Sequence, residues 1–173
     1  MNIYLCKMTK KLNRRLFQDF TNDPDICSEM NRFSKYIYCE ADVDARWERQ
    51  KKLNRIHLTI MLGQEPIGEI ILKDLDAEKG TLSIHMKNDV FKNHGYGTRA
   101  EFLALDYAFY TLGLQTVFAD VIHKNRRSQH VLEKIGFQKA HSDEQCVYYR
   151  CDKEVWDGNQ KNRGKPVCQA KTS

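Results

Sequence analysis

The chain has 173 residues, a length that suits one compact domain rather than two. Hydrophobic residues make up 41% and charged residues 29%, values typical of a globular protein, and no run approaches the ~20 apolar residues of a membrane span. The net charge of +5 is spread along the chain, with acidic residues between the basic ones. We therefore predict neither a nucleic-acid partner nor a membrane partner.

The six cysteines are scattered and form no C-x-x-C pair, so the sequence indicates neither a zinc site nor a redox dithiol. The N-terminal residues lack the apolar core, about 7–15 residues long, of a secretory signal. We predict reduced thiols, no bound metal and a cytoplasmic location.

The first half of the chain predicts one strand, two helices and then three strands. After a strand over residues 3–8, a first helix is indicated because Leu12, Leu16 and Phe20 recur on one helical face. A second helix is predicted over residues 43–53. Three strands joined by short turns follow, over residues 56–62, 66–75 and 81–86. Because short turns join these three strands, each is predicted to pair antiparallel with the next.

The second half predicts helices alternating with strands. A helix from Thr98 onward ends at Gly113, a residue suited to the left-handed conformation that closes helices. A shorter helix opens at Asn125 and closes at Gly136. The remaining strands are predicted over residues 115–122, 137–140 and 145–151. Residues 1–156 are predicted to form the domain, and the polar residues 157–173 to form a mobile tail.

One segment in the middle of the chain predicts a phosphate site. It reads Lys92-Asn93-His94-Gly95-Tyr96-Gly97-Thr98-Arg99-Ala100, two glycines followed by a helix-forming run. Glycines let a phosphate approach the backbone closely, and the first N–H groups of a helix bind anions. The spacing fits the G-x-G-x-x-G/A motif of dinucleotide sites, and it fits equally a loop for the pyrophosphate of coenzyme A.

The surrounding chain favours coenzyme A over a dinucleotide. Asp120 lies about twenty residues past Ala100, as a ribose-binding acid would in a dinucleotide site. However, that site needs its first glycine directly after the strand, whereas residues 87–94 intervene here. The preceding strands are also antiparallel, so a doubly wound parallel sheet does not fit. An NAD-dependent enzyme is thus a remote alternative.

Two motifs carry a resemblance to a known family. The run Lys92 to Gly97 is close to a Q/R-x-x-G-x-G/A loop, and Asn125-x-x-Ser128 leads into Val-Leu-Glu-Lys-Ile-Gly-Phe137. From Gly80 to Phe137 the chain resembles the GCN5-related N-acetyltransferases (GNAT), and among them the ribosomal-protein N-terminal acetyltransferase (RimJ/RimL-like) branch. Lys92 replaces the usual Gln or Arg, which keeps a cation but not a planar fork.

The resemblance implies an α+β domain with a mixed, mostly antiparallel sheet, flanked by helices and splayed at an acetyl-coenzyme A site. The split would lie between the strands at 81–86 and 115–122. Acetyl-coenzyme A would be the co-substrate, with the strand at Ile84 and Met86 pairing with its pantetheine arm. The implied cofactor-binding residues are Ile84, Met86, Lys92, Asn93, His94, Gly95, Tyr96, Gly97, Thr98, Arg99 and Asn125.

The resemblance also indicates a general acid for the departing thiolate. Much of the superfamily uses a tyrosine seven residues after the asparagine, and Leu132 stands there in this chain. The RimJ/RimL-like branch uses a serine three residues after it, which is Ser128 here. Asn125 and Ser128 also suit the N-cap and first turn of a helix, and that role alone would explain Ser128. The missing tyrosine keeps open a domain that binds acetyl-coenzyme A as a sensor without catalysis.

Glu69 and His85 are the candidates for the base. If the turn between their strands centres on Ala77, the two residues lie opposite each other, and a one-residue slip would separate them onto different faces. Such a pair could accept a proton or receive a cationic amine. It could equally be a structural pair.

The predicted function is acetyl transfer to a primary amine, with a protein or peptide N-terminal α-amine as the favoured acceptor. At pH 7 an α-amine is about 14% neutral and a lysine amine only about 0.04%, so the former needs the weaker base. Polyamines and aminoglycosides are the alternative acceptors. Domains of this kind also commonly form homodimers.

Overall fold

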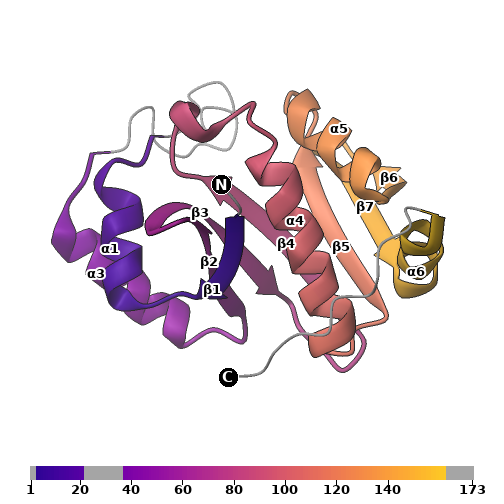
Figure 1. Ribbon diagram of the computed structural model, residues 1–173, viewed down its shortest axis with the longest axis horizontal. Helices are drawn as coiled ribbons and strands as arrows, with labels where there is room; N and C mark the ends of the chain where they lie inside the picture. The colour runs from indigo at the N-terminus through magenta and orange to yellow at the C-terminus, as the bar shows by residue number, and fades with distance from the viewer. Residues whose placement is uncertain (1–2, 22–36, 163–173) are drawn as a thin grey trace.

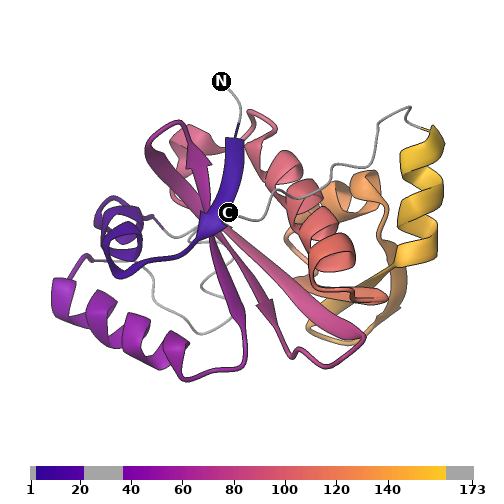
Figure 2. The ribbon, with the colours of Figure 1, turned by 60° about the horizontal axis from the view of Figure 1, so that its bottom comes forward.

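The computed structural model describes residues 3–21 and 37–162, which build a seven-stranded sheet with helices on both faces (Figures 1 and 2). The strand order is β1-β2-β3-β4-β5-β7-β6. The strands are β1 (Ile3–Lys7), β2 (Ile56–Leu62), β3 (Glu65–Lys73), β4 (Lys79–Met86), β5 (Thr116–Ile122), β6 (Gln138–Ser142) and β7 (Cys146–Asp152). The predicted α+β fold with a mixed, mostly antiparallel sheet is confirmed.

The helices divide between the two faces of the sheet. Their bounds are α1 (Lys10–Gln18), α3 (Glu40–Lys51), α4 (Tyr96–Asp106), α5 (Arg126–Ile135) and α6 (Lys153–Asn162). Helix α4 packs against β1, β3 and β4, whereas α1 packs against α3 and β3 (Figure 2). A short π-helical turn, Tyr107–Thr111, extends α4 toward Gly113, whose φ of 77° is left-handed, as predicted.

Strand β3 shows how the sequence separates the two faces. Ile70 and Leu72 belong to the main hydrophobic core, which the residues of α4 share. Glu69 and Ile71 alternate with them and line a cleft on the α3 side. Side chains alternate between faces along a strand, so β3 supports the core with one side and the cleft with the other. A smaller core of Met8, Leu16, Phe17 and Val43 holds α1 against α3.

The sheet splits between β4 and β5. Among the described strands this is the only parallel pair, and it is held by three residue pairs, Lys79–Thr116, Gly80–Val117 and Thr81–Phe118. Beyond them, β4 continues to pair with β3 and β5 with β7, but not with each other. The predicted splay between these two strands is therefore confirmed.

The bounds of two helices, α3 and α6, differ from the predictions. Helix α3 begins at Glu40 rather than residue 43, with Glu40 and Asp42 in its first turn, where acidic residues favour a helix N-terminus. Residues 157–162, predicted as the start of a tail, continue α6. Residues 163–173 lie outside the described part of the chain. No helix within residues 3–21 and 37–162 is long and apolar enough to cross a membrane.

Candidate active site

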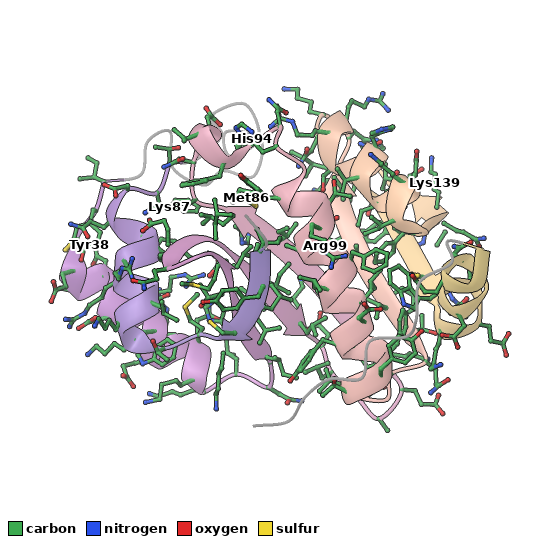
Figure 3. All side chains as sticks on the ribbon, viewed as in Figure 1. Tyr38, Met86, Lys87, His94, Arg99 and Lys139 are labelled. Carbon is green, nitrogen blue, oxygen red and sulfur yellow. The ribbon has the colours of Figure 1, made fainter. Side chains whose placement is uncertain are left out.

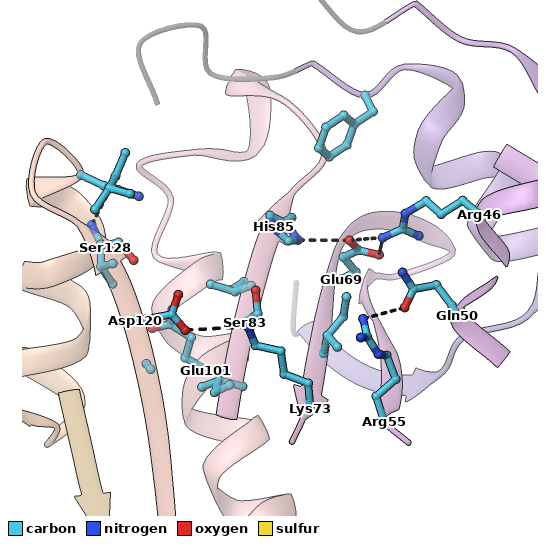
Figure 4. Close-up of a pocket in the computed structure, with 18 of the residues that line it drawn as sticks. Arg46, Gln50, Arg55, Glu69, Lys73, Ser83, His85, Glu101, Asp120 and Ser128 are labelled. Carbon is cyan, nitrogen blue, oxygen red and sulfur yellow. Dashed lines mark hydrogen bonds and ion pairs between the residues drawn. The ribbon is translucent and has the colours of Figure 1, made fainter. Parts of the chain in front are cut away.

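The split opens a cleft of about 1190 Å³ whose walls come from both halves of the sheet (Figure 4). Ser83, Ile84 and His85 line it from β4, and Ala119 to Ile122 line it from β5. Helix α3 forms a further wall, and Ser128 reaches the cleft from α5. From Leu82 to Met86, the edge of β4 that faces β5 has no strand partner among the described residues. Its backbone can therefore pair with an extended ligand.

The glycine loop leads directly into α4 at the open end of this split. Gly95 is the N-cap with a left-handed φ of 75°, and Asn93 also has a positive φ of 64°. The first helical bond joins the Arg99 N–H to the Gly95 carbonyl at 3.0 Å. The N–H groups of Tyr96, Gly97 and Thr98 precede it and have no partner within the helix, so they are available to an anion.

Figure 3 shows His94 in the loop before α4 and Arg99 on the helix itself. His94 stacks on Tyr96 with ring centres 5.5 Å apart. Lys92 forms an ion pair with Asp89. The Arg99 guanidinium lies 5.6 Å from the centre of the Phe102 ring on the same helix. The Lys92 charge is thus paired within the chain, whereas Arg99 is exposed and forms no ion pair with another described residue.

The packing of the described residues does not require a glycine at position 97. It lies within α4 without a positive φ, and a Cβ there would meet Ile84 and Met86 at an ordinary contact distance of 3.9 Å. Glycine in a helix costs about 1 kcal/mol relative to alanine, and no close packing within the described chain requires it. A phosphate lying against the backbone would require it.

Glu69 and His85 meet across β3 and β4, as the predicted register requires. The His85 Nδ1 lies 3.1 Å from Glu69 Oε1. Two further partners were not foreseen. Arg46 of α3 donates to both carboxylate oxygens at 2.7 and 3.0 Å, and the His57 Nε2 of β2 lies 2.6 Å from Oε2. The Glu69 carboxylate is 1% exposed and joins three elements.

Burial alone would raise the pKa of Glu69, but the hydrogen bonds from His57 and His85 and the charge of Arg46 outweigh it. They hold the pKa of Glu69 well below its ordinary value. The carboxylate therefore stays charged at neutral pH and is a poor base. Because a carboxylate only accepts hydrogen bonds, the ring proton of His85 lies on Nδ1, and Nε2 is left as the basic nitrogen. About half of the His85 side chain is exposed.

Asn125 and Ser128 open α5 beside the cleft. The Asn125 Oδ1 accepts the Ser128 backbone N–H at 3.1 Å, which is the N-cap arrangement. The Ser128 side chain lines the cleft, and its hydroxyl makes no hydrogen bond to another described residue. The cap uses the backbone of Ser128 and leaves its hydroxyl available. Leu132, where the superfamily tyrosine would stand, is buried in the core and also lines the cleft.

Glu101 of α4 is a cleft residue that our sequence analysis missed. It is 2% exposed, and its Oε2 is buried without a hydrogen-bond partner among the described residues. Burial raises the pKa of Glu101 to about 8, so the carboxyl is mostly protonated at pH 7. The sequence held a signal for this residue, because Glu101 and Leu105 of α4 and Ala108 of the following π-helical turn recur at helical spacing, and the other two are buried.

The comparisons with known proteins agree with this geometry. Residues 3–138 match the family model described as Acetyltransferase (GNAT) domain. No curated protein sequence matches the chain. One similar solved structure is the aminoglycoside acetyltransferase AAC(6')-Ib with coenzyme A, with a TM-score of 0.77, 16% identity and coverage of 92% of this chain and 99% of that one.

Two other solved structures are similar over most of their length. A putative acetyltransferase from T. thermophilus has a TM-score of 0.72 and 22% identity, with 95% of each chain covered. The spermidine N-acetyltransferase from Vibrio cholerae, in complex with coenzyme A and spermine, has a TM-score of 0.73 and 14% identity, with 89% of this chain and 97% of that one covered.

The family match spans most of the chain, so the protein belongs to the GNAT acetyltransferase domain family. As a member of this family the protein is an N-acetyltransferase, and the co-substrate of the family is acetyl-coenzyme A. This excludes the NAD-dependent alternative and disfavours the sensor without catalysis. In the described residues, no group of three or more His, Cys, Asp or Glu side chains could hold a metal ion.

Proposed function

We propose that the protein acetylates the N-terminal α-amine of a peptide or protein, as the RimJ/RimL-like resemblance implies. The observation that carries this proposal is that Glu69 is held in its charged form beside His85, which leaves the His85 imidazole as the base. Glu69 is held as a carboxylate by Arg46, His57 and His85, so it orients His85 rather than accepting protons itself. An imidazole is a weak base, which suits an α-amine with a pKa of about 7.8 better than a lysine or polyamine amine near 10.4.

The residues that would hold the co-substrate follow from the cleft. The N–H groups of Tyr96, Gly97 and Thr98 would bind the pyrophosphate, and the free edge of β4 from Leu82 to Met86 would pair with the pantetheine arm. The orphaned carboxyl of Glu101 fits the same arm, because a protonated carboxyl can donate its O–H to an amide carbonyl. When bound, acetyl-coenzyme A supplies an activated thioester.

Two side chains would move protons in the transfer. The acceptor nitrogen forms a bond to the acetyl carbon while the carbon–sulfur bond breaks, so the amine loses a proton and the sulfur gains one. His85 Nε2 would accept the proton from the amine. The Ser128 hydroxyl would donate to the departing sulfur. A backbone N–H of β4 would stabilise the charge on the thioester oxygen.

Polyamines and aminoglycosides form a second class of acceptor. Spermidine and aminoglycoside acetyltransferases are among the similar solved structures, although at 14–16% identity this likeness concerns the fold. Both alternatives are polycations. A polycation needs walls with free negative charge. Of the acidic residues in this cleft, Glu69 and Asp120 are paired with cations and Glu101 is mostly protonated at neutral pH, so we prefer the α-amine acceptor.

Mass spectrometry of a mixed reaction tests the proposal. Acetyl-coenzyme A would be incubated with the protein and a pool of N-terminal peptides, lysine peptides, polyamines and aminoglycosides. We expect acetylated peptide N-termini that an enzyme-free control lacks. Acetylated polyamines or aminoglycosides alone would contradict the α-amine acceptor and support the second class. Mass detection also avoids thiol reagents, with which the six cysteines would react.

Ser128→Ala tests the proposed acid. The variant keeps the backbone N–H that Asn125 caps, so we expect an intact fold, unchanged affinity for coenzyme A, and a kcat lower by about 10²–10⁴-fold. Ser142→Ala serves as the matched control, because Ser142 is exposed on β6 and lies outside the cleft. Steady-state kinetics and calorimetric titration give both values. An unchanged kcat would limit Ser128 to its place in the helix.

A further inference from the structure

The wall of the cleft formed by α3 and the adjoining ends of β2 and β3 carries Arg49 and Arg55, neither of which forms an ion pair with another described residue. Figure 4 shows Arg55 on this wall beside Gln50. Arg49 lines the cleft and forms no ion pair with a described residue. Arg55, just before β2, donates from Nη1 to the neutral amide of Gln50 at 2.9 Å. The Arg55 Nε is buried and has no hydrogen-bond partner among the described residues.

The acidic residues of the cleft are committed elsewhere or lie further away. Glu69 is paired with Arg46, and Asp120 lies 3.8 Å from Lys73. Glu101 is mostly protonated at neutral pH. Asp42 lies seven residues before Arg49 on α3, which is about 10 Å along a helix. Arg49 and Arg55 therefore form a local positive site with an unused donor.

This positive site lies within reach of the proposed base. Gln50 follows Arg46 by one helical turn, about 6 Å, and Arg46 contacts Glu69. Arg55 is two residues from His57, which also contacts Glu69, a separation of about 7 Å along a strand. The register pairs His57 with Ile71 and Ile71 with Ser83, so Arg55 lies two strands and about four residues from His85, roughly 16 Å between backbones. The two side chains span part of this distance. A carboxylate bound by Arg55 would thus lie roughly two to four residues away from an amine at His85, since an extended chain spans about 3.5 Å per residue.

We propose that Arg49, Gln50 and Arg55 form a carboxylate-binding subsite, and that the acceptor is an amine with a carboxylate roughly two to four residues from the reacting nitrogen. A guanidinium binds a carboxylate through parallel N–H donors, and the orphaned Arg55 Nε would gain a partner. The carboxylate is either an acidic side chain near a peptide N-terminus or the free terminal carboxylate of a short peptide. This inference rests on the proposed function and specifies its acceptor.

Matched acceptor pairs test the subsite. Peptides with Asp or Glu at the second, third or fourth position would be compared with their Asn or Gln counterparts, and short free peptides of the same lengths with their C-terminal amides. The first set tests an acidic side chain as the source of the carboxylate, and the second set tests a free C-terminal carboxylate. Each acceptor would be measured for kcat/KM with acetyl-coenzyme A. Binding would be measured separately by calorimetry in coenzyme A, which has no acetyl group to transfer.

We expect the carboxylate member of a pair to be preferred by at least about tenfold, equivalent to roughly 1.4 kcal/mol. Arg49→Gln and Arg55→Gln should each reduce this preference and leave the amide members nearly unaffected. Arg49 is exposed, so its variant tests the subsite even if Arg55→Gln fails to fold. Lys52→Gln is the control, because Lys52 is an exposed cation at the end of α3 outside the cleft.

The outcomes separate the subsite from the function. Acetylation of peptide amines without any preference for the carboxylate member would overturn the subsite and keep the proposed function. Arginine-dependent binding of the carboxylate members without acetylation would support the subsite and contradict the function. Neither binding nor acetylation of any pair member would overturn both.

Discussion

At the residue scale, the cleft contains two carboxyl groups whose surroundings shift their pKa in opposite directions. Glu69 is surrounded by donors that keep it charged, and Glu101 has none that the structure describes. Both lie almost entirely out of contact with solvent. The difference therefore comes from partners rather than from burial, and it gives the two residues different chemistry: one orients a base, and the other can donate a hydrogen bond.

Glu101→Gln should change stability in alkaline solution. The pKa of Glu101, about 8 in the folded protein, exceeds the ordinary value of 4.5. Its contribution to stability is therefore complete below about pH 4.5 and is lost as the pH rises through 8. Without coenzyme A, we expect the glutamine variant to be more stable than the native protein at pH 8.5 by about 1–3 kcal/mol, and nearly equal at pH 4.5.

Thermal unfolding at the two pH values measures this effect, with each 1 kcal/mol shifting Tm by about 2–4 °C. Glu154→Gln, on the exposed side of α6, is the control. If the Tm difference between Glu101→Gln and the native protein were the same at both pH values, Glu101 would not be protonated in the folded protein at neutral pH.

Gly97→Ala should separate folding from cofactor binding. Alanine favours the helix, so we expect the variant to be more stable by up to about 1 kcal/mol. The added methyl group would occupy the place of the approaching phosphate, and we expect at least roughly tenfold weaker binding of coenzyme A by calorimetry, about 1.4 kcal/mol. Gly158→Ala in α6 is the matched control, because that glycine is exposed with open space around it. Unchanged affinity in Gly97→Ala would place the phosphate elsewhere.

At the element scale, the catalytic cleft depends on the register of β3 and β4. This register was predictable, because a short turn centred on Ala77 fixes the pairing and alternation fixes the face. The observed Glu69–His85 pair agrees. Arg46 and His57 were not predictable as partners, since they come from α3 and β2, whose positions depend on tertiary packing. Sequence periodicity describes one element at a time and does not show which elements meet.

Glu69→Gln should weaken the contacts that hold α3 against the sheet, because Glu69 of β3 pairs with Arg46 of α3. Glutamine removes the charge that faces Arg46, and it keeps one acceptor oxygen but places an NH2 donor where the other oxygen accepts. We expect a loss of about 2–3 kcal/mol at pH 7, since Arg46 reaches solvent in part. The folded-state pKa of Glu69 lies below the ordinary value of 4.5. Its contribution to stability is therefore present above about pH 4.5 and is lost as the pH falls through the folded-state pKa.

Urea unfolding at pH 7, 5 and 3 measures the difference between native and variant, which should shrink as the pH falls. Glu48→Gln is the control, because Glu48 pairs with Lys51 on the exposed surface of the same helix. We expect it to cost less than about 1 kcal/mol. A native–variant difference for Glu69 that persists at pH 3 would contradict a charged Glu69 as the source of the stability.

At the scale of the whole molecule, the family motifs and the order of strands predicted the fold, whereas the helix that continues after Trp156 was not predicted. The polar composition after Trp156 indicated a tail. The structure instead continues α6 to Asn162, because Trp156 anchors the helix in the core, 4.6 Å from Phe102 between ring centres. The indole N–H donates to Asp106 at 3.1 Å. A single buried aromatic residue can hold a helix whose own sequence is mostly polar.

A chain that ends at Trp156 should therefore be less stable than one that ends at Asn162. The shorter chain loses the latter part of α6 and the Asp157 carboxylate, which accepts hydrogen bonds from Tyr110 and Lys153. We expect a difference of about 1–2 kcal/mol in the free energy of unfolding, measured in urea on both chains. If the two chains were equally stable, the result would support a domain that ends at residue 156, as the sequence indicated.

The three residue pairs between β4 and β5 have a consequence for solubility. Where the strands part, each presents an inner edge of unsatisfied N–H and C=O groups, and such edges promote intermolecular pairing. A ligand that lies along β4 would serve as the neighbouring strand for part of that edge. The cellular supply of acetyl-coenzyme A would then protect the enzyme from self-association as well as feed its reaction, and amide exchange in β4 should slow when coenzyme A binds.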